Sequence, residues 1–216
     1  MYNMAAMQHP HSGREEVANS ISHGLGLLLA LVALPVLVLA AIEAGNVGFL
    51  VGVSVFGGTM VLLYLASTLY HSLTHEAWKQ LFRVFDHTAI FLLIAGTYTP
   101  FALGVLRGPW GWSLLAIVWT LAITGIILKI RTRTRHSRIS IVLYVFMGWL
   151  AVVAVKPIVM LIPVPGILLI LAGGLAYTGG LAFFAAQRIR YNHFIWHLFV
   201  IAGTVCHFFA VLWYAA

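Results

Sequence analysis

Three histidines and one aspartate stand at the ends of hydrophobic segments, where a lipid bilayer disfavours ionisable side chains. They are His71, Asp86, His193 and His197. His193 and His197 are four residues apart, so they project from one face of a helix and can bind a single ion. Ionisable groups inside membrane spans usually mark functional sites, and three histidines with a carboxylate can form a zinc site. These side chains are therefore candidates for a metal centre, provided that the fold brings them together.

The composition identifies the class of protein. Of the 216 residues, 62% are hydrophobic and 8% are charged, whereas soluble domains average about 25% charged residues. At roughly 20 residues per span, such a chain has room for about six to eight membrane helices and no further soluble domain is expected. The single cysteine excludes an intrachain disulfide and a cysteine-based zinc cluster.

The hydrophobic runs predict an all-α membrane protein, a bundle of seven transmembrane helices. A backbone that crosses lipid must satisfy its own hydrogen bonds, which favours helices. Glycines and prolines fall between several of the runs. Residues 1–13 are expected to form a disordered cytoplasmic tail, and residues 14–216 a single membrane domain. The predicted spans cover about 20–42, 47–70, 86–106, 111–129, 139–156, 163–186 and 193–215.

The basic residues predict the direction of the chain through the membrane. If the N-terminus is inside, ten lysines and arginines fall in cytoplasmic segments and two in outside segments. That bias follows the positive-inside rule and predicts an inside N-terminus and an outside C-terminus. Five of the ten lie in the sequence KIRTRTRHSR at 129–138. Orientation beside anionic lipid explains this basic loop better than nucleic-acid binding does.

The direction of the spans places the candidate residues at one depth. The second span ends at His71, the third begins at Asp86 and the seventh begins at His193, and all three ends face the cytoplasm. Three neutral imidazoles leave Zn²⁺ one open position, as in catalytic sites. Water there can have its pKa lowered toward about 7, and Asp86 would act on it as general base. Ser67, one turn before His71, could hold the water or a substrate oxygen.

A purely structural role is the alternative for each of these side chains, because histidines at span ends also hydrogen-bond with loops and lipid headgroups. Glu16 approaches the first span on the same side, and its charge could support the site or stabilise the start of a helix. The structural role is the expected one for His23, His75, His87 and His207.

Four motifs occur in order along the chain: EVANSISHG at 16–24, STLYH at 67–71, DHTAIFLLIAGTYTP at 86–100 and HFIWH at 193–197. Together they resemble the hemolysin III family, the bacterial branch of a superfamily that includes adiponectin and progestin receptors. The similarity extends from about Glu15 to the C-terminus. It implies a seven-helix bundle in the inner (plasma) membrane of a bacterium, with an intracellular N-terminus.

The resemblance also implies roles for individual residues. In the receptor branch, three histidines bind zinc near the cytoplasmic side, and their positions correspond to His71, His193 and His197. An aspartate that contacts the zinc through water corresponds to Asp86, and a serine corresponds to Ser67. The long cytoplasmic N-terminal domain of the receptors has no counterpart here, so receptor signalling of that kind is not expected.

Three functions are compatible with these observations. The superfamily is linked to hydrolysis of lipid amides such as ceramide, which implies a zinc-dependent membrane hydrolase for lipid amides or esters, or a membrane-homeostasis factor derived from one. A pore-forming, cytolytic protein with a structural zinc is the second, although polar groups clustered at one end of the spans disfavour a constitutive monomeric channel. The third is a non-catalytic receptor or regulator of membrane state. Membrane lipids are the expected partners, nucleic acid is not, and homo-oligomers are compatible with the sequence.

Overall fold

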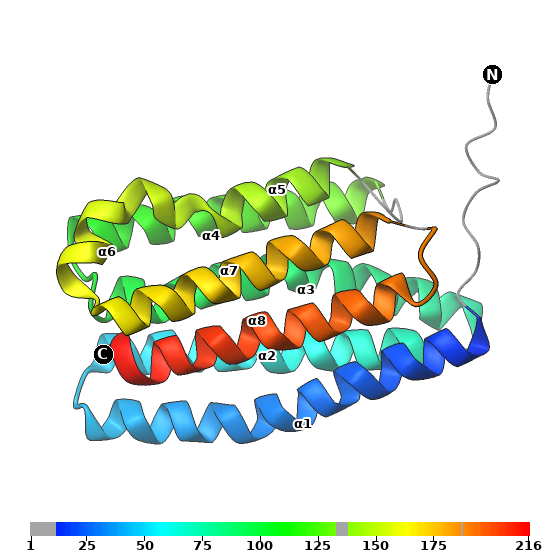
Figure 1. Cartoon of the computed structure of the whole chain (residues 1–216), viewed down its shortest axis with the longest axis horizontal. Coiled ribbons are helices and arrows are strands. Elements are labelled where there is room, and N and C mark those ends of the chain that lie inside the picture. The colour runs from blue at the N-terminus through cyan, green and yellow to red at the C-terminus, as the bar shows by residue number, and fades with distance from the viewer. Residues whose placement is uncertain (1–11, 133–137, 187) are drawn as a thin grey trace.

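The computed structural model describes residues 12–132, 138–186 and 188–216. Within these residues it is all-helical, and seven helical segments are long and apolar enough to cross a membrane. They lie side by side along the long axis of the molecule (Figure 1). The predicted all-α, seven-helix architecture is confirmed. The elements are α1 (Gly13–Glu43), α2 (Val47–Ser72), α3 (Glu76–Leu103), α4 (Pro109–Thr132), α5 (Arg138–Gly148), a 3₁₀ helix (Leu150–Ala154), α6 (Val155–Leu161), α7 (Val164–Ala185) and α8 (Asn192–Tyr214).

Two helices begin well before their hydrophobic runs. The first starts at Gly13 rather than near residue 20, because Ser12 and Glu15 form a capping box that satisfies each other's main-chain N–H groups. The third starts at Glu76, ten residues before its predicted start at Asp86. Hydropathy misses such polar first turns because they need not lie in lipid. Of the predicted tail, residues 1–11 lie outside the described residues.

The fifth span is interrupted, and it extends beyond its predicted end at 156. It consists of α5, the 3₁₀ helix and α6, and it runs to Leu161. Pro157 lies in the first turn of α6, where a missing N–H leaves no helical bond unmade. At this interruption, Tyr98 of α3 supplies hydrogen bonds to backbone groups. Its hydroxyl donates to the Met147 carbonyl at 2.8 Å and accepts from the Ala151 N–H at 3.0 Å. These bonds satisfy backbone groups that lipid would leave unpaired.

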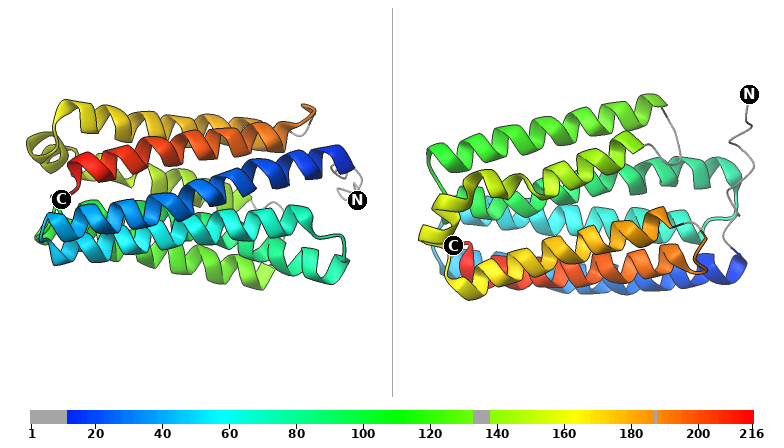
Figure 2. Two further views of the ribbon diagram at one scale, coloured as in Figure 1. Left: turned by 90° about the horizontal axis from the view of Figure 1, so that it is seen from below. Right: turned by 45° about the horizontal axis from the view of Figure 1, so that its top comes forward.

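The helices form a closed ring. Each helix from α1 to α5 contacts the next one along the chain. Helix α5 then contacts α7, α7 packs against α8, and α8 packs against α1. The view from below shows α1 between α2 and α8 (Figure 2, left). The start of α1, the end of α2, and the starts of α3 and α8 share one end of the bundle (Figure 1). That this end faces the cytoplasm stays a prediction from the loop charges.

The packing of α2 against α3 is close enough to fix their relative position. At Gly52, an added Cβ would lie 2.5 Å from the Cα of Pro100 in α3. Only glycine lets the two backbones approach this closely. The contact sets the register of α2 against α3, and therefore the position of His71 relative to Asp86.

Candidate metal centre

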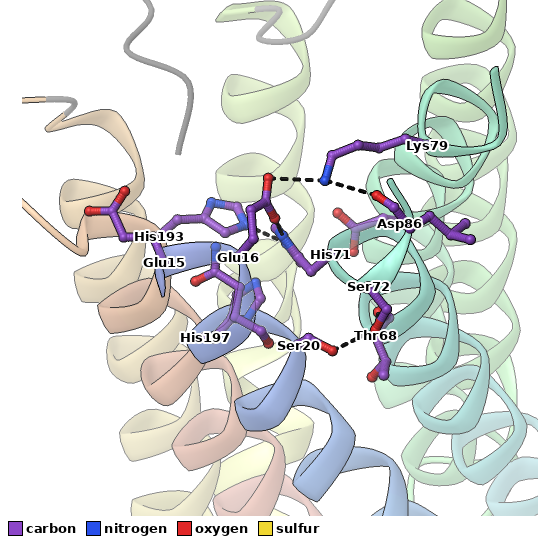
Figure 3. Close-up of polar contacts among 12 residues, drawn as sticks. Glu15, Glu16, Ser20, Thr68, His71, Ser72, Lys79, Asp86, His193 and His197 are labelled. Carbon is purple, nitrogen blue, oxygen red and sulfur yellow. Dashed lines mark hydrogen bonds and ion pairs between the residues drawn. The ribbon is translucent and has the colours of Figure 1, made fainter. Parts of the chain in front are cut away.

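The three predicted metal ligands meet inside the bundle. His71 lies in the last turn of α2, and His193 and His197 lie in the first two turns of α8. All three are buried, with exposed fractions of 4%, 8% and 1% respectively. Each offers one atom within 4.8 Å of the other two, an arrangement that could hold a metal ion. The sequence-based grouping of these histidines is therefore confirmed as a spatial one (Figure 3).

The spacing of the nitrogens fits a small transition-metal ion. An ion bound tetrahedrally at about 2.0–2.1 Å from each nitrogen holds its ligand atoms about 3.3 Å apart. The Nε2 atoms of His71 and His193 are 3.2 Å apart. The ring of His197 lies 4.6 Å from that of His193 and 5.1 Å from that of His71, centroid to centroid. Three imidazoles suit Zn²⁺, Cu²⁺, Fe²⁺ or Ni²⁺, so the donor set alone does not choose among them.

Helix α1 orients two of the three candidate ligands through their Nδ1 atoms. The Nδ1 of His71 lies 2.6 Å from Oε2 of Glu16. The Nδ1 of His197 lies 3.0 Å from the Ser22 hydroxyl and 3.1 Å from the Asn19 carbonyl. A carboxylate and a carbonyl can only accept, so each Nδ1 carries the proton and donates it. Each Nε2 then keeps its lone pair for the metal, an arrangement typical of metal-binding histidines.

The supporting residues are themselves held in place from neighbouring helices. Lys79, in the first turn of α3, places its Nζ 3.1 Å from Oε1 of Glu16 and 3.3 Å from the Leu73 carbonyl (Figure 3). Glu15 accepts a hydrogen bond of 2.9 Å from the main-chain N–H of Tyr191, where the chain turns into α8. The start of α1 therefore ties α2, α3 and α8 together around the site.

Replacing Glu16 with alanine tests this supporting role. The three ligands remain, but His71 loses the carboxylate that fixes its tautomer, so metal affinity is expected to fall about 10–100-fold. Competition with a chromophoric chelator measures the change. Glu43→Ala, which removes an exposed carboxylate at the other end of the same helix, is the matched control. Equal affinities in the two variants would show that Glu16 does not support the site.

Asp86 and Ser67 lie beside the three-histidine group and not within it. Asp86 is buried in α3 and borders the same cavity as His193 and His197. Ser67, fully buried one turn before His71, lies next to the Asp86 carboxylate, although its hydroxyl makes no hydrogen bond of good geometry with the described residues. Their position agrees with roles in handling water or substrate, and those roles stay predictions.

Lys129 is a charge near the site that the sequence analysis did not recognise. It was assigned to the basic loop as an orientation signal, but its side chain is buried in the last turn of α4. Its charge lies near enough to act on Asp86. Its position in the sequence could have indicated this burial, because Lys129 comes before the arginines of the loop and lies at the end of the apolar run. Residues 133–137 of that loop lie outside the described residues.

A cavity leads from the metal centre toward the other end of the bundle. It measures about 90 Å³ and lies mainly between α3, α5, α7 and α8, with His23 of α1 and Leu63 of α2 also on its wall. Asp86, His193 and His197 border one end, and His207 borders it ten residues further along α8. The wall between is largely apolar, as expected for a site that binds an apolar ligand with a few polar anchors. Its apolar lining includes Leu63, Ile90, Leu93, Ile94, Val145, Leu181, Phe184 and Val200.

Four histidines were expected to be structural. The Nδ1 of His87 donates to the Arg83 carbonyl at 2.7 Å, and the Nε2 of His207 lies 3.2 Å from the Ile170 carbonyl. His75 is the exposed N-cap residue of α3. His23 differs from the other three, because its ring lies directly against that of His197.

Comparison with known proteins shows the family of the chain. A family model described as Haemolysin-III related matches residues 11–208. The chain belongs to this family. The resemblance carried by the four sequence motifs is thereby confirmed, and the chain is an integral, multi-pass membrane protein of the hemolysin III family.

Curated relatives of this hemolysin III family member are similar over most of their length. Hemolysin-3 of Bacillus cereus is 50% identical over 201 residues, which cover 93% of this chain and 92% of the relative. The Hemolysin-3 homolog of Bacillus subtilis (strain 168) is 45% identical over 201 residues, 93% and 94% of the two chains. The human monocyte to macrophage differentiation factor is 25% identical over 166 residues, 73% of this chain and 67% of that protein. That more distant match fits the wider receptor superfamily.

Proposed function

We propose that this hemolysin III family protein is a zinc-dependent hydrolase that cleaves amide or ester bonds of membrane lipids. The observation that carries the proposal is the convergence of His71, His193 and His197 at the end of an apolar cavity that Asp86 also borders. Three imidazoles leave a coordination position for water or substrate. Asp86, a buried carboxylate that borders the same cavity as His193 and His197, would supply the base that hydrolysis needs.

The proposed reaction divides the chemistry between a metal ion and the residues of the chain. Bound zinc would polarise the lipid carbonyl and make water acidic enough to ionise near neutral pH. Asp86 accepts the proton of the attacking water and returns it to the leaving nitrogen or oxygen as the bond to the carbonyl carbon breaks. Ser67 holds a substrate or water oxygen. Glu16 and Ser22 keep the histidine ligands aligned throughout.

The shape and lining of the cavity support a lipid substrate. On one side the cavity is bordered by Gly148 at the end of α5 and by Gly174 and Leu181 of α7. These two helices touch along only a short stretch, and Gly148 is exposed on the surface that would face lipid. An acyl chain could enter there directly from the bilayer, while its carbonyl reaches the metal centre. We place the protein in the plasma membrane with its N-terminus inside, as the loop charges predict.

Product analysis of the purified protein tests the proposal. Zinc-loaded protein in nanodiscs is supplied with ceramide, with other N-acyl lipids and with phospholipid esters, and the products are identified by mass spectrometry. We expect release of a free fatty acid from one of these classes, loss of release after chelation, and recovery when zinc is returned. Turnover that survives metal removal, or fully zinc-loaded protein that releases no product from any class, would contradict a metal hydrolase.

A pore-forming protein with a structural metal is the second candidate, because one similar bacterial protein is named Hemolysin-3 and another is named a Hemolysin-3 homolog. Most of the buried ionisable side chains among the described residues lie at one end of the bundle, and the cavity beyond them is largely apolar. A constitutive pore through one chain would need a polar path along the whole span. Conductance in liposomes at full zinc occupancy, without lipid products, would favour the pore. Zinc binding with neither activity would favour a regulator of membrane state.

A further inference from the structure

His23 is placed between the metal centre and the core of the bundle. Its ring stacks on that of His197, with centroids 3.5 Å apart and planes at 10°. It also meets the ring of Tyr64 at nearly a right angle, with centroids 5.0 Å apart and planes at 87°. Only 3% of the residue is exposed. These contacts fix the ring in one orientation without using its polar atoms.

Both ring nitrogens of His23 are buried without a hydrogen bond to any residue that the structure describes. The main-chain carbonyl of His197 lies beside the ring but outside hydrogen-bonding geometry. An imidazole always carries at least one N–H donor, and buried polar groups in folded proteins almost always have a partner. The expected partner of His23 is therefore a bound molecule and not a side chain.

Because His23 borders the cavity, a molecule bound to its N–H is expected to lie inside that cavity. His23 borders the cavity together with Asp86, His193 and His197. Asn19, one turn earlier on α1, also has a buried and unpartnered side chain among the described residues, but it does not border the cavity. At the far end of the cavity, His207 already has its Nε2 against the Ile170 carbonyl. His87 also borders the cavity at the metal end, but its Nδ1–H already donates to the Arg83 carbonyl. Among the described histidines outside the three-histidine group, His23 is therefore the one at this end whose N–H is available to a ligand.

We propose that His23 is a binding residue whose N–H donates a hydrogen bond to an acyl oxygen, of a carbonyl or a carboxylate, held beside the metal centre. A neutral donor on that oxygen gains strength as negative charge develops there, and it requires no movement of the stacked ring. The choice of an acyl group rests on the function proposed above. Binding of the oxygen requires no turnover, so the two ideas can be tested apart.

The probe is laurate, a carboxylate with the chemistry of a hydrolysis product, added to cobalt-substituted protein in detergent. The visible absorption of bound Co²⁺ reports both metal content and a ligand at its open position. His23→Phe keeps a ring against His197 but removes both nitrogens, and His23→Gln keeps a donor but removes the ring. His75→Phe makes the same change at an exposed position on α3. His23→Leu removes the donor by a second route, should the phenylalanine variant not fold.

We expect all four variants to bind one equivalent of cobalt. The Kd of laurate should rise about 10–100-fold in His23→Phe and His23→Leu, the effect of losing a hydrogen bond to a charged ligand. The Kd should stay at the wild-type value in His75→Phe and recover in part in His23→Gln.

Three results would overturn the inference: an unchanged laurate Kd in the variants without a donor, loss of cobalt from every His23 variant, or a wild-type spectrum that does not respond to laurate. Laurate binding that depends on His23, in a protein that hydrolyses no lipid, would remove the proposed function and leave this inference standing. Lipid turnover together with a laurate Kd that does not depend on His23 would leave the proposed function standing and overturn this inference.

Discussion

Replacing His71 with alanine is expected to lower metal affinity by about 100–1,000-fold. Structural zinc sites bind with roughly 10–16 kcal/mol, so one of about four ligands contributes on the order of 3–4 kcal/mol, which corresponds to that factor. The loss falls on a buried histidine that supplies one of three converging nitrogens. Lipid turnover should disappear with the metal. Metal content per chain after dialysis against a weak chelator measures the effect.

The control for His71→Ala is His75→Ala. His75 follows His71 by four residues but is exposed, as the N-cap residue of α3. Its loss should leave metal content and turnover at the wild-type level. Full metal occupancy in His71→Ala, with the His75 variant equally loaded, would mean that the three histidines are packed together for another reason.

Replacing Asp86 with asparagine is expected to separate chemistry from metal binding. The amide has nearly the shape of the carboxylate but cannot take a proton from water, and loss of a general base lowers turnover about 100–10,000-fold. Zinc content should stay at one equivalent, because Asp86 lies outside the ligand group. The experiment measures kcat for the lipid that the product analysis identifies, together with the metal content of the same preparation.

Two outcomes for Asp86→Asn would contradict the proposed mechanism. Unchanged turnover would show that another group handles the proton. Loss of zinc would show that Asp86 binds the ion directly. Unchanged conductance in liposomes, in a protein without turnover, would instead support the pore-forming alternative.

The grouping of the three candidate metal ligands was predictable from the sequence, because it depends on few features. Loop charges set the direction of each span, span ends set the depth, and the spacing of His193 and His197 sets one helix face. These features placed His71 at the same depth, and the structure brings the three side chains together. The number of spans was predictable for the same reason, since each hydrophobic run is long enough to be recognised alone.

The contributions of α1 and Lys129 were not predictable in the same way. Glu16 was placed before the first span, because hydropathy does not register a polar turn that begins at a capping box. Its partner His71 lies on another helix, and the rotation of one helix against the next is not encoded in local periodicity. The contact of His23 with His197 joins α1 to α8, so local periodicity does not predict it either. Lys129 counts among the basic residues that predict the orientation of the chain, and its charge does not indicate whether its side chain is buried.

X-ray absorption at the zinc edge of the purified protein tests the central claim most directly. The claim is that His71, His193 and His197 form a metal centre with an open position for chemistry. We expect one zinc per chain, with three imidazole nitrogens at about 2.0–2.1 Å and one further oxygen ligand from water. Loss of one imidazole shell in His71→Ala would complete the assignment. A fourth imidazole, which would close the site, or a protein that retains no metal, would contradict it.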